Sequence, residues 1–367
     1  MRLLLVVLTF ALATAGASSA HASVPVPPGW PHHLALGVSD QPGDARGLVR
    51  HARFDARYQY LAGGVNTGGG WATWNPGGSF ASSYVNESIA AHVIPVLSYY
   101  QLLQSKPSVG SDELHRDLSN LRDPATMAAY WADWSLLMRR IAAPSASHLV
   151  VVHVEPDLWG YLEQAHATSL ARAFAAHLVS LRDRLAPHVL LAWHLSVWGT
   201  DEDPTYSKPS LAHMDRLAAE SASFYESLGT RFDLVFNDVT DRDAGFYKVI
   251  EGNPNTAWTA PDFRRHDAYI AGFTRRTGTP VVLWQLPLGN TFLNNTWDHF
   301  RDNRVQWWLG SGSGPHLRAT EAAGVIGLLF GGGADGTTSA QTDGGLFFRL
   351  SRQYLEHPLA LGTAPPF

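Results

Sequence analysis

The hydrophobic pattern of this chain alternates between short apolar runs and longer segments with helical periodicity. In 124–142 the residues Tyr130, Trp134, Leu137 and Ile141 recur at helical spacing, and 169–185 and 211–228 are also predicted to be helical. The apolar runs have strand length and end in polar, glycine or aromatic residues. They are Leu34–Ser39, Ala56–Gly63, His92–Tyr99, His148–Glu155, Val189–Ser196, Leu234–Asp238, Val281–Leu286 and Val325–Phe330.

Strands that alternate with helices predict an α/β fold with a parallel sheet. Eight such units over about 330 residues match a single (β/α)8 TIM-type barrel, regular or distorted, with some long loops. A doubly wound sheet is the alternative, but it usually carries a glycine-rich phosphate loop after its first strand. Here that strand ends in Gly37-Val38-Ser39-Asp40, without such a loop. We therefore expect one barrel domain over residues 34–367.

The N-terminus has the pattern of a secretory signal peptide. Arg2 is followed by an almost wholly apolar stretch, Leu3 to Ala13, and Ala20-His21-Ala22 fits the cleavage pattern. An uncleaved anchor is the alternative, although the apolar stretch is short for a membrane span. We expect a signal peptide over 1–22, a proline-rich leader over 23–33, and a secreted protein without membrane attachment after cleavage.

Composition narrows the function classes. The 367 residues carry 27 Lys+Arg against 32 Asp+Glu, a formal net charge of −5, and no basic run, which argues against nucleic-acid binding. The absence of cysteine excludes disulfides, thiol nucleophiles and zinc–thiolate sites. Thirteen tryptophans are many for this length, and tryptophan is the residue that stacks on sugar rings. We expect a monomer that needs no cofactor.

Carboxylates, amides and indoles collect at the ends of the predicted strands. In an eight-stranded barrel the carboxyl ends of the strands form the active site. Because these ends carry almost no Arg or Lys, the pattern favours a neutral, hydroxyl-rich ligand. For His194, a hydrogen bond to the ligand and a purely buried role are both open. The predicted ligand-binding residues are Asp40, Trp71, Trp74, Tyr100, Trp159, His194, Trp198, Gln285 and Asn290.

The fourth strand carries His153, Glu155 and Asp157 at alternate positions, which in an extended chain point to the same side. Two nearby acids push their pKa values apart, so that one can stay protonated as a general acid while the other is ionised. Glycoside hydrolysis needs such a pair, or two acids from facing strands. The alternatives are that either acid caps the next helix or pairs with an arginine, or that the three residues bind a metal.

Two stretches resemble motifs of glycoside hydrolase family 6, the secreted cellulases with a distorted β/α barrel. Val154-Glu155-Pro156-Asp157-Leu158 resembles the family's Glu-Pro-Asp motif, and the resemblance implies that Asp157 is the catalytic acid. Gly332-Gly333-Ala334-Asp335-Gly336-Thr337 resembles a C-terminal motif and implies a base at Asp335. The family's Asp-rich stretch after an earlier strand and its disulfides are absent. Glu155-Pro156 also resembles the Asn-Glu-Pro of retaining barrel glycosidases, but Gln285 stands where those enzymes have a Glu nucleophile.

Together these observations predict a secreted glycoside hydrolase that acts on a polysaccharide or oligosaccharide, with a neutral β-glucan-like glycan as the expected substrate. Asp157 or Glu155 would protonate the leaving oxygen, and Asp238 or Asp335 would activate water or attack. Two alternatives stay open. One is a catalytically inactive barrel that binds a glycan, and the other is a metal-dependent carbohydrate hydrolase or deacetylase with metal at His153.

Overall fold

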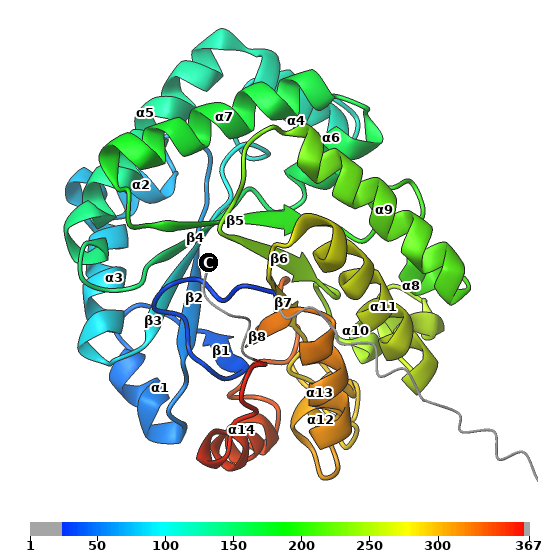
Figure 1. Ribbon diagram of the computed structural model, residues 1–367. Helices are drawn as coiled ribbons and strands as arrows, with labels where there is room; N and C mark the ends of the chain where they lie inside the picture. The colour runs from blue at the N-terminus through cyan, green and yellow to red at the C-terminus, as the bar shows by residue number, and fades with distance from the viewer. Residues whose placement is uncertain (1–23, 363–367) are drawn as a thin grey trace, which may run out of the picture.

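The computed structural model describes residues 24–362, and the predicted signal peptide lies outside them. Eight parallel strands form a closed barrel in sequence order, as Figure 1 shows at the centre of the molecule. The predicted (β/α)8 barrel is therefore confirmed. The strands are β1 Ala35–Ser39, β2 Ala56–Leu61, β3 Ile94–Tyr99, β4 Val151–Val154, β5 Leu190–Leu195, β6 Leu234–Asp238, β7 Val281–Leu286 and β8 Val325–Phe330.

Helices surround the barrel and separate it from solvent (Figure 1). Besides the single 3-10 turns η1 Pro76–Gly78 and η2 Pro254–Thr256, the helices in chain order are α1 Ala45–His51, α2 Trp71–Trp74, α3 Ser79–Ala90, α4 Glu113–Arg122, α5 Pro124–Ser145, α6 Leu158–Gln164, α7 Thr168–Leu185, α8 Pro204–Ser207, α9 Leu211–Ser227, α10 Ala244–Val249, α11 Ala260–Thr277, α12 Arg304–Leu309, α13 Gly314–Ala322 and α14 Leu346–Glu356.

Local sequence sets where the main helices begin and end. The side chain of Asp123 accepts a hydrogen bond from the backbone N–H of Thr126 at 2.7 Å and so caps the start of α5. Thr259 and Asp262 form a reciprocal capping box at the start of α11, and Gly278 ends this helix with φ +65°. These signals fix the entry and exit of long helices that pack on the barrel.

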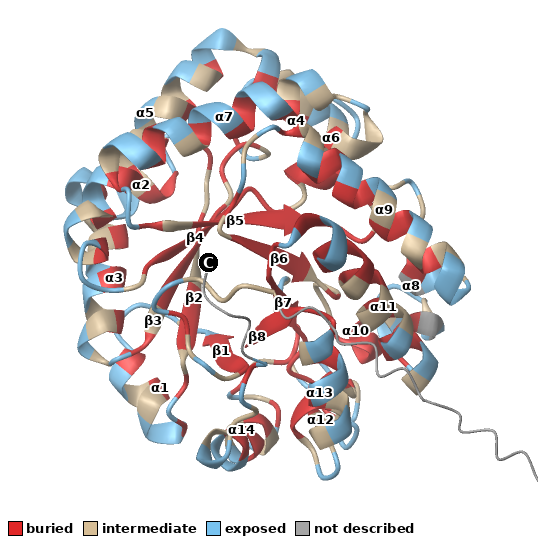
Figure 2. Cartoon of the chain, viewed as in Figure 1, coloured by how far each residue is buried: buried red, intermediate tan, exposed pale blue. Residues whose placement is uncertain are grey.

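The core lies between the strands and the inner faces of the helices. Figure 2 shows the strands as mostly buried and the long outer helices with a buried inner and an exposed outer side. All six residues of β7 and of β8 are buried, as expected for parallel strands covered on both faces. The predicted helical stripe of Tyr130, Trp134 and Leu137 is fully buried on α5.

The described part of the leader also packs on the barrel. Trp30 is almost fully buried, and its indole N–H donates to the carbonyl oxygen of Ile326 at 3.0 Å, near the start of β8. Val24 and Val26 are partly buried against the same core. The packed chain therefore begins before residue 34.

Candidate active site

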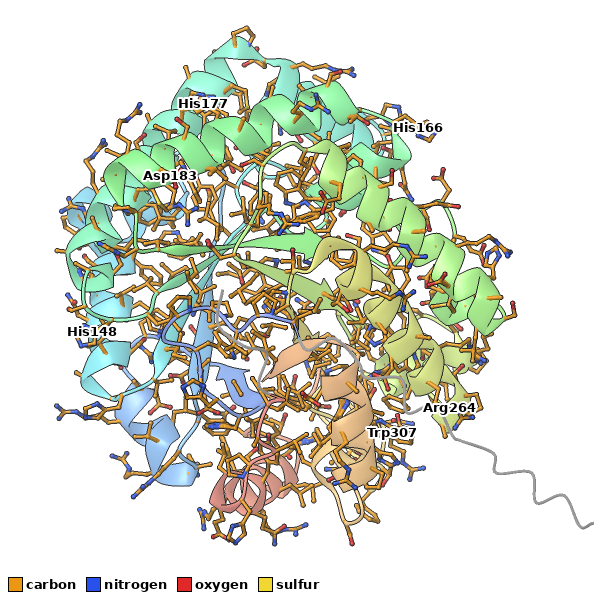
Figure 3. All side chains as sticks on the ribbon, in the orientation of Figure 1. His148, His166, His177, Asp183, Arg264 and Trp307 are labelled. Atoms are coloured by element: carbon orange, nitrogen blue, oxygen red, sulfur yellow. The ribbon has the colours of Figure 1, made fainter. Side chains whose placement is uncertain are left out.

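A cavity of about 660 Å³ opens among the loops that follow the carboxyl ends of the strands. It lies where a β/α barrel ordinarily places its reactive groups. Five of the residues predicted from the strand ends line this cavity, namely Tyr100, Asp157, Trp198, Asp238 and Gln285. Figure 3 places His148, His166 and His177 on the outer layer of helices and loops, away from the barrel centre.

Asp157 is held in a tight turn directly before α6. Its φ of +71° and ψ of −39°, with a hydrogen bond of 2.9 Å from the Leu158 N–H to the Pro156 carbonyl, describe a strained γ-turn. The turn aims the carboxyl at the cavity, where the Tyr100 hydroxyl lies 3.4 Å from Asp157 Oδ2. Although Asp157 occupies the N-cap position of α6, its side chain makes no capping hydrogen bond.

The surroundings of Asp157 disfavour its ionised form. Burial raises the pKa of Asp157 to about 7, the interaction with His194 opposes this rise, and the carboxylates of Asp238 and Glu113 add to it. A substantial share of the Asp157 side chains is therefore protonated at neutral pH, and more below it. A carboxyl group in this state suits general acid catalysis.

Asp238 ends β6 and faces the same cavity. Its Oδ1 lies 3.3 Å from Nε2 of His194, which is fully buried on β5. His194 does not line the cavity itself, so the structure places it behind Asp238 and not against a ligand. Its Nδ1 lies 3.0 Å from Nε2 of His153 on β4.

Glu155 lies beneath the cavity and does not line it. Its two carboxyl oxygens accept hydrogen bonds of 3.2–3.3 Å from the backbone N–H groups of Gln101 and Leu102. The expectation that His153, Glu155 and Asp157 share one side is wrong, because β4 ends at Val154 and Glu155 has a φ of +46°. Strand alternation stops there, and Glu155 anchors the loop that follows β3.

Burial also shifts the titration of Glu155. It raises the pKa of this carboxyl to about 8, although the backbone N–H groups of Leu102 and Gln101 favour the ionised form. The group is therefore mostly protonated at neutral pH. This shift arises in a loop anchor with no contact to the cavity, so here a raised pKa by itself does not identify a catalytic acid.

An irregularity in β7 turns two successive residues toward the cavity. The pairing of β7 with β8 shifts between Leu283 and Leu286, and Gln285 has a φ of +56°. As a result both Trp284 and Gln285 line the cavity, and the Gln285 amide donates a hydrogen bond to the hydroxyl of Tyr60. Trp284 forms part of the floor, with its ring 5.7 Å from that of Tyr60.

Two arginines reach the cavity, against the expectation of almost no positive charge there. Arg242 forms an ion pair with Asp241, and both residues line the cavity. Arg304 comes from α12 and pairs with the buried Asp302 at 2.6 Å. Both cations are thus already engaged. The acidic side chains of the lining are Glu113, Asp157, Asp203, Asp238 and Asp241.

Several predicted residues lie outside the cavity lining. Asp40 pairs with the fully buried Arg57 at 2.6 Å, and Asn290 is buried and bonded to the backbone of Asp343. Trp74 is exposed, and its indole N–H donates to the carbonyl oxygen of Gly69 at 2.9 Å. Asp335 is exposed and contributes no atoms to the lining. Its predicted role as a base therefore has no support from its position.

The prediction that Trp71 and Trp159 stack on a sugar is wrong. Both indoles are fully buried, so neither offers a face to a ligand. The Trp71 N–H donates to Asp133 at 2.7 Å, and the Trp159 N–H donates to the Val154 carbonyl at 2.9 Å. Each ring follows a strand but turns back into the layer between barrel and helices, where it stabilises packing.

Most cavity-lining residues that the sequence analysis did not predict come from loops and from positions within strands. The buried carboxylate of Asp243 connects two of the loops, because it accepts backbone hydrogen bonds of 2.8 Å from Gly289 in the loop after β7 and from Thr338 in the loop after β8. The alternation of β2 could have indicated Tyr60, but loop residues have no such signal. The additional aromatic lining residues are Tyr60, Tyr161, Tyr206, Tyr247, Trp258 and Trp284.

The fold is similar to those of solved glycoside hydrolases. An exo-β-1,4-mannosidase from Opitutaceae bacterium strain TAV5 superposes with a TM-score of 0.54 at 12% identity, over 90% of this chain and 61% of the mannosidase. A Bacteroidetes-affiliated family 5 cellulase gives 0.53 at 10% identity, over 89% of this chain and 92% of its own. Thermotoga maritima Cel5A in complex with mannotriose gives 0.51 at 11% identity, over 87% and 97%.

This chain thus spans about three fifths of the length of the mannosidase. At such identities the likeness shows a common fold alone. No family model and no curated protein matches the sequence. The resemblance to family 6 cellulases therefore stays a prediction.

Proposed function

We propose that this protein is a glycoside hydrolase that cleaves glycosidic bonds of a polysaccharide or oligosaccharide. The observation that carries the proposal is the pair of Asp157 and Asp238, which line one cavity at the barrel mouth in different surroundings. Asp157 has a raised pKa of about 7, whereas Asp238 lies beside the imidazole of His194. Two carboxyl groups with such different surroundings provide an acid and a base or nucleophile.

In the proposed reaction, protonated Asp157 donates its proton to the glycosidic oxygen as the bond to the anomeric carbon breaks. Asp238, in its ionised form, either removes a proton from the attacking water or attacks the anomeric carbon itself. Water supplies the hydroxyl group of the new reducing end in both routes. The anomeric configuration of the first product, followed by NMR, distinguishes the two.

The lining favours an uncharged glycan, such as a β-linked glucan or mannan. Aromatic side chains including Tyr161 and Trp198 offer faces for sugar rings, and carboxylates and amides offer hydrogen-bond partners for hydroxyls. Arg242 and Arg304 are paired with acids within the protein. An acidic sugar would therefore meet mainly carboxylates, and we expect uronate or sulfated polymers to be disfavoured. A mannosidase and a cellulase are among the proteins of similar fold named above.

No observation favours the metal-dependent alternative. Within residues 24–362 no three His, Asp or Glu side chains are grouped so that they could hold a metal ion. His153 contacts Ser98 and His194 in the barrel interior.

Export remains a proposal from the N-terminal pattern, and no helix within the described residues is long and apolar enough to cross a membrane.

A screen for reducing-sugar release tests the proposal. Wild-type protein and the Asp238→Asn variant are incubated with soluble β-glucans, mannans and galactans. We expect release from at least one neutral polymer by the wild type and a loss of at least about 100-fold in the variant, the scale for a lost acid or base. Glycan binding without any release by folded wild-type protein would instead favour the inactive, glycan-binding barrel.

A further inference from the structure

Four consecutive strands each contribute one polar side chain to a continuous row inside the barrel. Ser98 Oγ on β3 lies 3.4 Å from His153 Nδ1 on β4, and His153 Nε2 lies 3.0 Å from His194 Nδ1 on β5. His194 Nε2 lies 3.3 Å from Asp238 Oδ1 on β6. The row therefore passes from each strand to the next, from β3 to β6, and ends at a carboxylate that faces the cavity.

The row is enclosed by aromatic rings. Ser98, His153 and His194 have no accessible surface. The ring of His153 lies 4.6 Å from those of Phe236 and Trp284, and the ring of His194 lies 5.8 Å from that of Trp284. In such surroundings a polar atom without a partner is costly, and hydrogen bonds are stronger than in water. The protons in this row therefore occupy defined positions.

The chemistry of Asp238 fixes these positions. An ionised carboxylate only accepts, so the nitrogen that faces it, His194 Nε2, must carry a proton. In the neutral imidazole, Nδ1 is then an acceptor, and His153 must donate from its own Nε2. His153 Nδ1 is left as an acceptor for the Ser98 hydroxyl. Burial and the neighbouring His194 lower the pKa of His153 well below 6.5, in keeping with a neutral ring.

We propose that Ser98, His153 and His194 form a hydrogen-bond relay that orients Asp238 and favours its ionised form. The inference rests on the proposed function and deepens it. Asp238 would be the second reacting carboxylate, and the two histidines would be positioning residues that never touch the substrate. His194 Nε2 and Asp238 Oδ1 lie 3.3 Å apart without hydrogen-bond alignment in the free protein, and within residues 24–362 neither of these two buried atoms has another hydrogen-bond partner, so each is available to the other.

Asp241, which follows Asp238 in the loop after β6, is held differently. Asp241 pairs with Arg242 and accepts a hydrogen bond of 2.5 Å from the Tyr247 hydroxyl. An arginine partner makes a carboxylate a weak nucleophile and a weak base, because the pair must be broken before it reacts. Within residues 24–362 no Arg or Lys forms an ion pair with Asp238, and in the relay His194 supplies one donor to its Oδ1.

Several titratable groups surround Asp238. The carboxyl groups of Asp157, after β4, and Asp241, in the loop after β6, line the same cavity, and Tyr60 from β2 adds a buried hydroxyl. His194 from β5 faces Asp238 Oδ1, and His266 from α11 is neutral, because burial lowers its pKa to about 4. A proton fixed on His194 Nε2 therefore acts against the repulsion of two neighbouring carboxylates. Removing it should make Asp238 take up a proton more readily.

Substitution of His153 tests the relay without changing any cavity residue. In His153→Leu the acceptor His194 Nδ1 loses its donor, so the His194 ring is no longer held in one orientation and its Nε2 proton is no longer fixed toward Asp238. We expect kcat to fall about 10–100-fold with little change in KM, and the acidic limb of the kcat/KM profile to move up by about one pH unit. In His153→Gln the amide N–H can donate in place of the imidazole, and most of the activity should return.

A wild-type pH profile of kcat/KM in His153→Leu would overturn the relay. Equal losses of kcat in the Leu and Gln variants, with the acidic limb of the profile unchanged, would also overturn it. Nitrogen-15 NMR of labelled histidine in the wild-type protein provides a test that needs neither activity nor a folded variant. We expect both His153 and His194 to be neutral with the proton on Nε2. A proton on Nδ1 of neutral His194 contradicts the relay. The expected tautomers in a protein that cleaves no glycan would leave the relay intact and refute the proposed hydrolase.

Discussion

Asp157 and Glu155 are two residues apart, but Asp157 lines the cavity and Glu155 anchors a loop. A matched pair of substitutions distinguishes these two roles. Asp157→Asn removes the only proton that this residue can donate at the cavity. Glu155→Gln acts on a carboxyl group that is mostly protonated at pH 7, because its pKa is about 8. Its amide oxygen can still accept from the N–H groups of Gln101 and Leu102, which lie 3.2–3.3 Å from the carboxyl oxygens.

The expected magnitudes follow from these contacts. Loss of a general acid lowers kcat by about 100- to 10,000-fold, equivalent to about 3–5 kcal/mol of transition-state stabilisation. We therefore expect Asp157→Asn to lose at least about 100-fold. Glu155→Gln should stay within a few fold of wild type at pH 7, since the substituted amide resembles the neutral acid that it replaces. Neither variant should unfold, and asparagine tolerates the positive φ of position 157.

Aryl glycosides with different leaving groups provide the assay. A good leaving group such as dinitrophenolate departs without protonation, whereas a sugar hydroxyl does not. Asp157→Asn should thus lose most activity on natural linkages and least on the dinitrophenyl glycoside. The wild-type kcat should fall as the pH rises through about 7, since the active form of Asp157 is protonated and its pKa is about 7. This alkaline limb should be absent in the variant.

Glu163→Gln is the control for loss of a buried carboxyl group. Burial raises the pKa of Glu163 to about 7 as well, but this residue lies on α6 outside the cavity lining. The Glu163→Gln variant should be as active as the wild type. The assignment would be refuted if Glu155→Gln lost 100-fold and Asp157→Asn did not, or if both variants lost activity equally on every leaving group.

Three further outcomes follow from the structure. Trp198→Ala should weaken oligosaccharide binding by about 1–3 kcal/mol in calorimetry, while Trp159→Phe should change thermal stability but not affinity, and the opposite result would place the stacking face elsewhere. Burial raises the folded-state pKa of Glu155 to about 8 and those of Glu163 and Asp267 to about 7. Since stability from such groups is present at low pH and is lost as the pH rises through the folded-state pKa, the melting temperature should fall by about 5 °C or more between pH 5 and pH 8; a rise over this range in calorimetry would contradict it. Binding of a neutral oligosaccharide should change little between low and high salt, and tighter, salt-sensitive binding of an oligouronate would overturn the neutral-glycan proposal.

The barrel could be predicted because parallel strands that are buried on both faces have continuous apolar sequences. Three predicted runs, Leu234–Asp238, Val281–Leu286 and Val325–Phe330, coincide with β6, β7 and β8. The polar residues that end these runs must then meet at one mouth, which is a consequence of topology alone. This is why Tyr100, Asp238 and Gln285 could be placed near a common cavity without a structure.

The same reasoning fails where side-chain direction depends on a single backbone torsion. Alternation along β4 predicts a common side for Glu155 and Asp157, but positive φ values at both residues redirect one to a loop and the other to the cavity. The sequence has no glycine there to indicate a change in conformation. Such strain in residues other than glycine persists only where surrounding contacts hold it, and those contacts come from residues distant in sequence. For Glu155 they are the amides after β3.

Most cavity-lining residues outside the strands could not be predicted from the sequence for a related reason. Arg304, at the start of α12, pairs with Asp302, which also accepts from the Ala244 amide at 2.9 Å and so joins the loops after β6 and β7. No periodicity encodes such a contact. By contrast, Ser98, His153 and His194 occupy inward positions on adjacent strands, so their meeting inside the barrel is set by register. A polar row at such positions can therefore be found by reading successive strands of a predicted barrel together, whereas each strand read alone shows only an isolated buried histidine.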